Sequence, residues 1–391
     1  MKLKILHPED LQDLVCVVMG TRPGIIKQSP VIRALSEDNV PFFTIHTGQH
    51  YSYEMDLKFF EDLELPKPDI RINNLGKEQL HGEQTAEMLK GVEAALIQKR
   101  PKMVLVGGDA NTNLAAALAS RKLHIPVGHV EAGLRSYDWR MPEEHNRVII
   151  DHISECLFIP SQDAEKNLKQ EGVRGKIFQV GSTVVDAIAQ HLPLADKKSR
   201  ILNHLNLDGK KFALMTVHRE ENTDYFENLQ LLLSLVKGLI EQFRFLIVFP
   251  VHPRTRKRME EFNLLEEVKK ISNLILLDPL GYLDFLQLLK SSSLALTDSG
   301  GLQQEACILH IPCITLREST EWVETVQAGF NIVAGMNLET ATASAEKLLS
   351  KEIQWTNLYG DGTSGKQVSA IVQRLLKEGI PVPGELNLIH G

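Results

Sequence analysis

The sequence predicts an α/β protein built from two doubly wound, Rossmann-like domains that face a cleft. Short apolar runs, typical of buried parallel strands, alternate with helix-like segments along the chain. Glycine-containing turns follow several of these runs. The alternation pauses at residues 194–200, LADKKSR, and then restarts. Because such alternation produces a parallel sheet covered on both faces, we expect two sheets joined by this linker.

The elements follow in order. In the first domain, residues 1–193, strands are expected at 14–20, 42–47, 103–106, 127–130, 157–160 and 177–180. Helices are expected at 25–35, 52–62, 79–98 and 112–122, and again from 143 after an irregular loop at 134–142. In the second domain, residues 194–364, strands are expected at 212–217, 245–251, 274–277, 294–297 and 313–316. Doubly wound sheets bind ligands beyond the carboxyl ends of their strands, so functional side chains are expected there.

Composition excludes several classes of protein. The 391 residues carry a net charge of −7, which disfavours nucleic acid and anionic membranes as partners. No apolar run approaches the ~20 residues of a membrane span, and acidic residues interrupt the N-terminal segment, unlike a signal peptide. The cysteines lack metal-ligand spacing and are expected to be reduced core residues of a cytoplasmic protein: Cys16, Cys156, Cys307 and Cys313.

Residues 294–316 predict a nucleotide-binding turn. A strand is followed by Ser299, Gly300 and Gly301 and then by a helix. The glycines let the backbone approach a bound group, and the N–H groups of a helix start suit a phosphate. Glu305, about a turn into the helix, could hold ribose hydroxyls. The alternative is an ordinary turn between a strand and a helix.

Charged residues at the other strand ends suggest acid–base chemistry. Arg22 and Lys27 near the first helix start could bind phosphate, or could be surface residues. Asp109 and Glu131 each end an apolar strand, where paired carboxylates suggest proton transfer or stabilisation of a cation.

Four further residues are more ambiguous. Glu143 and Glu144 open a helix, where acids commonly complement the helix dipole. His218 ends a strand of the second domain and could act as an acid, a base or a phosphate donor. His252 holds the equivalent position after the next strand, and a structural role is the stronger reading there.

Motifs for common cofactors are missing from the sequence. It contains no GxxxxGK[ST] loop, no GxGxxG after the first strand and no HExxH. We therefore expect no cofactor and no metal.

Taken in order, the motifs resemble those of one family across nearly the whole chain. They are Gly20-Thr21-Arg22-Pro23 with Lys27, Thr47-Gly48-Gln49-His50, Gly108-Asp109, His129-Val130-Glu131-Ala132-Gly133-Leu134-Arg135, Pro142-Glu143-Glu144-His145-Asn146-Arg147, Thr216-Val217-His218-Arg219-Glu220 and Thr297-Asp298-Ser299-Gly300-Gly301 with Glu305. This set is similar to the non-hydrolysing UDP-N-acetylglucosamine 2-epimerases, which have a glycosyltransferase-B-like fold.

The resemblance implies a role for each matching residue. The UDP-binding set would be Arg22, His218, Phe285, Ser299, Gly300, Gly301 and Glu305, with Phe285 beside the uracil, and Arg317 would lie near the substrate. The catalytic set would be Lys27, Asp109, Glu131, Glu143 and His218. It further implies a homodimer, and a last helix near residues 365–379, within a segment 365–391 that crosses back to the first domain.

The chain also departs from the family pattern. Gly24 replaces a glutamate, and Trp322 and Val323 replace an arginine and a proline. Gln49 of an allosteric loop is kept, whereas Ser52 replaces a second glutamine.

The implied reaction inverts C2 of a UDP-N-acetylhexosamine by eliminating UDP to give 2-acetamidoglucal and then adding it back, with the domains closing around the intermediate. The sequence leaves alternatives open: a hydrolysing 2-epimerase that releases N-acetylmannosamine and UDP, a different UDP-linked amino sugar, a glycosyltransferase, or a nucleotide-sugar sensor. A sensor would not need the acids at Asp109, Glu131 and Glu143, because binding UDP requires none of them.

Overall fold

The structure is a computed structural model that describes residues 6–48, 53–72, 80–350 and 353–380. The chain forms two compact units, Met1–Ala189 with Tyr359–Gly391 and Gln190–Leu358. The first crossing between them falls within helix α7 (Thr183–Lys198), so most of the stretch expected as a linker is the end of a helix. The allosteric-loop residues Gln49 and Ser52 lie outside the described residues.

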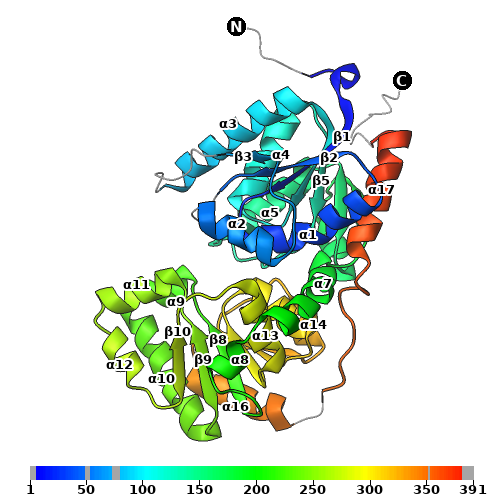
Figure 1. Cartoon of the computed structure of the whole chain (residues 1–391). Coiled ribbons are helices and arrows are strands. Elements are labelled where there is room, and N and C mark those ends of the chain that lie inside the picture. The colour runs from blue at the N-terminus through cyan, green and yellow to red at the C-terminus, as the bar shows by residue number, and fades with distance from the viewer. Residues whose placement is uncertain (1–5, 49–52, 73–79, 351–352, 381–391) are drawn as a thin grey trace. The chain divides into compact units, whose positions relative to one another are not determined.

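The first unit contains a seven-stranded parallel sheet in the order β3-β2-β1-β4-β5-β6-β7 (Figure 1). Its strands are β1 (Gln12–Met19), β2 (Phe42–His46), β3 (Ile70–Arg71), β4 (Pro101–Gly107), β5 (Val127–Val130), β6 (Cys156–Ile159) and β7 (Lys176–Gln179). Its helices, with the 3-10 turn η1 (Pro8–Asp10), are α1 (Arg22–Glu37), α2 (Tyr53–Asp62), α3 (His81–Lys99), α4 (Asn111–Lys122), α5 (Pro142–Ile153), α6 (Gln162–Gln170), the start of α7, and α17 (Ser364–Glu378).

The second unit contains a six-stranded parallel sheet in the order β10-β9-β8-β11-β12-β13. Its strands are β8 (Phe212–Thr216), β9 (Leu246–Pro250), β10 (Leu274–Leu277), β11 (Leu294–Thr297), β12 (Cys313–Thr315) and β13 (Asn331–Val333). Its helices are the end of α7, α8 (Ile201–His204), α9 (Glu220–Thr223), α10 (Phe226–Phe243), α11 (Pro253–Glu261), α12 (Leu265–Lys269), α13 (Tyr282–Ser291), α14 (Gly300–Ile308), α15 (Val323–Gln327) and α16 (Leu338–Ser350).

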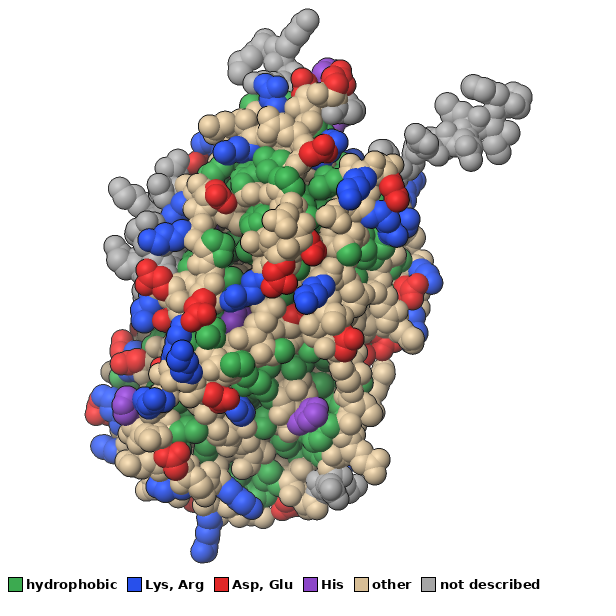
Figure 2. All heavy atoms as spheres, turned by 45° about the vertical axis from the view of Figure 1, so that its right-hand side comes forward, with side chains coloured by type: hydrophobic (Ala, Val, Ile, Leu, Met, Phe, Trp, Pro, Cys, Tyr) green, Lys and Arg blue, Asp and Glu red, His purple; other side chains and the backbone are tan. Residues whose placement is uncertain are grey.

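Burial on both faces explains the apolar strands. Every residue of β5, β6, β11 and β12 is buried, and hydrophobic clusters flank each sheet. The four cysteines are free and buried, as expected. On the face shown in Figure 2, acidic and basic side chains are interspersed, so it carries no large patch of a single sign.

The last helix belongs to the first unit. Helix α17 lies beside α1 (Figure 1), and the Asp186 carboxylate of α7 accepts hydrogen bonds from the N–H groups of Ser364 and Gly365 at 3.2 and 2.8 Å. A Cβ at Gly365 would lie 2.6 Å from the Pro30 carbonyl oxygen, so glycine allows the two helices to approach closely.

Candidate active site

The strand order places one ligand-binding edge in each unit. In the first sheet the order reverses between β1 and β4, and in the second between β8 and β11. Ligands bind beyond the carboxyl ends of strands at such points. The residues predicted at strand ends therefore fall into two groups, one in each unit.

At the end of β1, Gly20 leaves room for the hydroxyl groups of Thr47 and Thr112. The Oγ1 atoms of Thr47 and Thr112 lie 2.8 Å apart, and a Cβ at Gly20 would lie 2.0 Å from the first and 2.3 Å from the second. Thr21 then caps α1, because its side chain accepts the N–H of Gly24 at 3.2 Å. This start of α1 directs Lys27, one and a half turns later, toward the ends of β4 and β5.

Lys27, Asp109 and Glu131, which the resemblance groups as catalytic residues, lie close together. Lys27 Nζ forms an ion pair with Glu131 Oε2, and the charge of Asp109 also acts on Lys27. Arg147 of α5 completes the group, because its Nη2 donates to Asp109 Oδ2 at 2.6 Å. Its Nη1 donates to Glu144 Oε2 at 2.7 Å. Two cations thus face three carboxylates.

Glu131 is the most constrained of these residues. Its φ of 69° lies in the left-handed region, which is uncommon for a residue other than glycine. The side chain is 4% exposed, and Oε1 is buried without a hydrogen-bond partner among the described residues. Burial raises the pKa of this carboxyl above its usual value, although Lys27 opposes the rise. Gly108 (φ 81°) lies against this pair, since its Cβ would be 3.1 Å from Lys27 Nζ.

Glu144 fixes the loop between β5 and α5. Its buried carboxylate accepts the backbone N–H groups of Ser136, at 3.1 and 3.0 Å to its two oxygens, and Tyr137 at 2.9 Å. Glu144 therefore does more than complement the helix dipole, because it also binds the loop and Arg147. Glu143 is half-buried in the same first turn of α5. Arg22 opens α1, with its guanidinium carbon 5.4 Å from the centre of the Phe59 ring.

In the second unit, Asp298 organises the end of β8. Asp298 Oδ1 lies 2.9 Å from Nδ1 of His218. The carboxylate also accepts the backbone N–H groups of His218 and Arg219, each at 2.9 Å to Oδ2. Although burial alone would raise the pKa of Asp298, these partners lower it below its usual value. The His218 ring is 33% exposed, so Nε2 is the nitrogen oriented for a ligand. His252 caps α11 through Nδ1, which is the structural role expected for it.

The start of α14 differs in detail from the prediction. Ser299 caps the helix by accepting the N–H of Leu302 at 3.5 Å. A Cβ at Gly300 would lie 1.9 Å from Glu321 Oε1, so this glycine makes room for a protein side chain. Gly301 is exposed, and its Cβ would meet nothing closer than Ser299 Oγ at 3.8 Å. Both glycines were expected to let a bound group approach the backbone, but only Gly301 leaves the space for it.

The remaining predicted residues surround this helix start. Glu305 accepts a hydrogen bond from Tyr282 Oη at 3.0 Å, and burial together with this carboxylate raises the pKa of Tyr282 well above its usual value. Phe285 is half-buried on α13, packed against a core cluster. Arg317 is buried beyond β12, where its Nη1 lies 2.9 Å from Glu321 Oε2.

Sequence reasoning gave no role to three residues that hold these groups in place. Asp298 and Arg147 lie within motifs quoted above, and Tyr282 lies three residues before Phe285. Their position next to predicted site residues is the only sequence signal, because each contacts a partner from another element.

Comparison with known proteins identifies the family. Residues 33–373 match the family model described as UDP-N-acetylglucosamine 2-epimerase. The chain belongs to this family.

Relatives in the UDP-N-acetylglucosamine 2-epimerase family match almost end to end. The Methanococcus maripaludis UDP-N-acetylglucosamine 2-epimerase is 48% identical over 91% of this chain and 97% of its own. A Pseudomonas aeruginosa relative, UDP-2,3-diacetamido-2,3-dideoxy-D-glucuronate 2-epimerase, is 40% identical over 92% and 99%.

Solved structures agree with the fold. The Methanocaldococcus jannaschii UDP-GlcNAc 2-epimerase in complex with UDP-GlcNAc and UDP has a TM-score of 0.87 at 46% identity, over 92% of this chain and 99% of that one. A Burkholderia multivorans trehalose 6-phosphate synthase shares the fold alone, with a TM-score of 0.52 at 14% identity over 94% of this chain and 93% of that one. The fold class is therefore glycosyltransferase-B-like, as predicted.

The described residues contain neither a metal site nor a membrane span. No group of His, Cys, Asp and Glu side chains among them could hold a metal ion. Likewise, no helix within the described part of the chain is long and apolar enough to cross a membrane.

Proposed function

We propose that this family member interconverts UDP-N-acetylglucosamine and UDP-N-acetylmannosamine without net hydrolysis. The observation that supports it most directly is the group at the ends of β4 and β5. There the carboxylate of Asp109 and the buried carboxylate of Glu131 are held by Arg147 and Lys27. Binding a nucleotide requires no such pair, whereas moving a proton on a sugar does.

The chemistry explains why carboxylates suffice. The C2 proton of an N-acetylhexosamine is not adjacent to a carbonyl, so direct removal would need a very strong base. If the C1–O bond breaks first, its electron pair leaves with the diphosphate and the sugar becomes cationic. The C2–H pair then forms the C1–C2 double bond of 2-acetamidoglucal, and the proton passes to a carboxylate. Protonation of the opposite face, followed by return of UDP to C1, gives the epimer.

Inversion requires proton transfer at both faces of C2, and we assign the two faces to Asp109 and Glu131. The raised pKa of Glu131 makes it a stronger base than an ordinary glutamate, and its unpartnered Oε1 can accept the proton. Lys27 keeps the Glu131 carboxylate charged before transfer. Glu143 supports the pair from the first turn of α5.

Each unit has groups suited to the charge of the leaving diphosphate. In the second unit these are His218, oriented by Asp298, and the open helix start at Ser299 and Gly301. In the first unit it is Arg22 at the start of α1. The nucleoside is assigned to α13 and α14, with Glu305 on the ribose hydroxyls and Phe285 beside the uracil. Arg317 and Gly300 contribute indirectly, through Glu321. The scheme needs no cofactor, because UDP itself is held and returned.

The test is proton NMR of UDP-N-acetylglucosamine incubated with the purified chain. Signals of UDP-N-acetylmannosamine should grow to a constant ratio while free UDP stays below the enzyme concentration. Accumulation of free N-acetylmannosamine with UDP would instead identify a hydrolysing enzyme. If UDP-N-acetylglucosamine stays unchanged, the same assay with the diacetamido-glucuronate substrate named for the Pseudomonas relative tests the neighbouring specificity.

A further inference from the structure

His129, the third residue of β5, has hydrogen-bond acceptors at both of its ring nitrogens. Its Nδ1 lies 2.7 Å from Asp151 Oδ1, and its Nε2 lies 3.0 Å from the carbonyl oxygen of Gly108. Neither oxygen carries a proton, since Asp151 is ionised and a carbonyl can only accept. The ring is therefore held in place at both of its nitrogens.

The ring is 1% exposed and lies beside a buried network of charged groups. Asp151 is fully buried and also bonds Arg135, whose Nη1 lies 2.7 Å from Asp151 Oδ2. Arg135 in turn donates two parallel bonds to Glu171, each 2.7 Å long. Asp151, Arg135 and Glu171 thus form a continuous chain of charges that starts at the His129 ring. His129 and Arg135 hold the pKa of Asp151 below its usual value, despite the opposing effect of burial.

This chain of charges holds two turns at once. His129 binds the carbonyl of Gly108, the residue before Asp109. Asp151 Oδ2 accepts the N–H of Gly133, two residues after Glu131, at 3.1 Å. The turns that carry the two candidate carboxylates are therefore tied to one histidine–carboxylate pair. The tie also helps hold Glu131 in its left-handed conformation, which is strained for a residue other than glycine.

We propose that His129 is a positioning residue that, with Asp151, sets the placement of Asp109 and Glu131. The part of this inference that concerns turnover rests on the proposed epimerase function, whereas the placement of the two carboxylates does not.

Positioning can be separated from stability with a matched pair of variants. Asp151→Asn removes a buried carboxylate that bonds an arginine and a backbone N–H. Glu155→Gln removes another, which bonds Arg121 and the N–H of Val127, both at 2.7 Å, at the opposite end of β5. Both variants should lower Tm. Only Asp151→Asn should lower kcat, by about a hundredfold with little change in KM, because a displacement near 1 Å can cost that much.

Equal kcat values for the two variants would refute the positioning role. If the wild-type chain does not epimerise any UDP-amino sugar, the proposed function fails instead. A ¹³C titration of the Glu131 carboxyl then decides the inference: its pKa should change in Asp151→Asn and stay constant in Glu155→Gln, and an unchanged pKa in both would reject it.

Discussion

Glu131 concentrates the chemistry of the first unit in one side chain. It is buried, left-handed in backbone conformation, paired with Lys27 and adjacent to a second acid. Such a carboxylate is costly to the fold, because burial disfavours its charge. A strained and partly compensated acid at a strand end fits the proton-transfer role proposed for it.

Replacing Lys27 tests this compensation through stability alone. The raised pKa of Glu131 means that its charged form costs stability above that pKa, and the cost disappears as the pH falls below the unfolded value. Lys27→Met removes the opposing charge and should raise that pKa further. We expect a loss of about 3 kcal/mol at pH 8 that shrinks toward pH 5, measured by urea unfolding.

The exposed pair Lys102–Asp13 supplies the control for Lys27. Lys102→Met should cost no more than about 1 kcal/mol and show little dependence on pH over this range. A loss in Lys27→Met that does not depend on pH would contradict the proposed balance.

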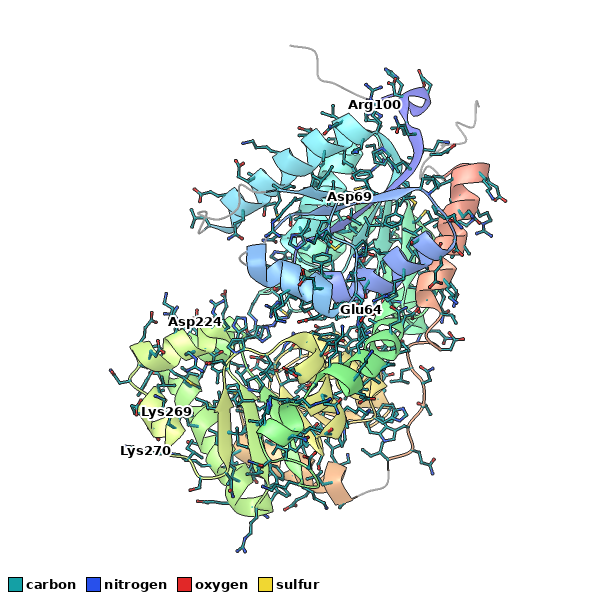
Figure 3. All side chains as sticks on the ribbon, viewed as in Figure 1. Glu64, Asp69, Arg100, Asp224, Lys269 and Lys270 are labelled. Atoms are coloured by element: carbon teal, nitrogen blue, oxygen red, sulfur yellow. The ribbon has the colours of Figure 1, made fainter. Side chains whose placement is uncertain are left out.

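Asp109→Asn tests the acid–base pair. The amide keeps an oxygen to accept from Arg147 but cannot exchange the proton, so kcat should fall about a hundredfold or more. The affinity for UDP, measured by calorimetry, should stay within a factor of about three, since a change below 0.7 kcal/mol is small on this scale. Asp69→Asn makes the same charge change at a carboxylate that bonds Thr44 (Figure 3), and it should keep kcat. A wild-type rate in Asp109→Asn would remove Asp109 from catalysis.

The sequence predicted which individual side chains form the candidate sites, but not the partners that hold them in place. Asp109, Glu131 and His218 could be named because each ends an apolar strand or lies in a recognisable motif. Arg147 is 38 residues from Asp109, and Asp298 is 80 residues from His218. No local pattern links positions so far apart, and only the parallel sheets bring them together.

Among the elements, α14 shows how one turn serves both the fold and the site. Gly300→Ala would place a Cβ against Glu321 and push it from Arg317, so we expect a loss of about 1–3 kcal/mol together with weaker UDP binding. The neighbouring Gly301→Ala meets open space and should preserve the free energy of unfolding. Urea unfolding of the two variants compares them directly, and equal losses would refute the assigned difference.

The packing of helix α17 against α1 can be tested in the same way. Gly365→Ala would bring a Cβ against the backbone of Pro30 in α1 and should cost about 1–3 kcal/mol. Gly82→Ala, on an exposed turn of α3 with nothing within 4 Å, should be neutral or stabilising by up to about 1 kcal/mol. Thermal unfolding measures both, and a neutral Gly365→Ala would show that α17 shifts freely on α1.

Strands that lie in clear apolar runs were predictable, whereas two short strands outside such runs were not. The expected ranges for β5, β10 and β11 match the observed bounds, and the three residues of β12 lie within the range expected for it. Strands β3 (IR) and β13 (NIV) include polar residues and are too short for a pattern to stand out, and both were missed. The linker was misplaced because LADKKSR is charged and polar, yet most of it continues the amphipathic helix α7.

Across the whole chain, each unit carries its own group of candidate residues. The first holds the carboxylates and their cations, and the second holds the histidine, the helix start and the acid proposed for ribose. The alternation of strands and helices predicted both sheets, and the restart after residue 200 predicted that there would be two. The positive charges of helix α11 are largely balanced by nearby acids. Asp224, for example, forms ion pairs with Arg254 and Arg258 of this helix (Figure 3).

The proposed mechanism assigns the removal and return of the C2 proton to the carboxylates of the first unit. Its most direct test is proton and deuterium NMR of UDP-N-acetylglucosamine turned over in deuterated water. We predict that deuterium enters C2 of both sugar nucleotides as they interconvert, and that Asp109→Asn suppresses this exchange together with turnover. Formation of UDP-N-acetylmannosamine that keeps its original hydrogen at C2 would contradict the account.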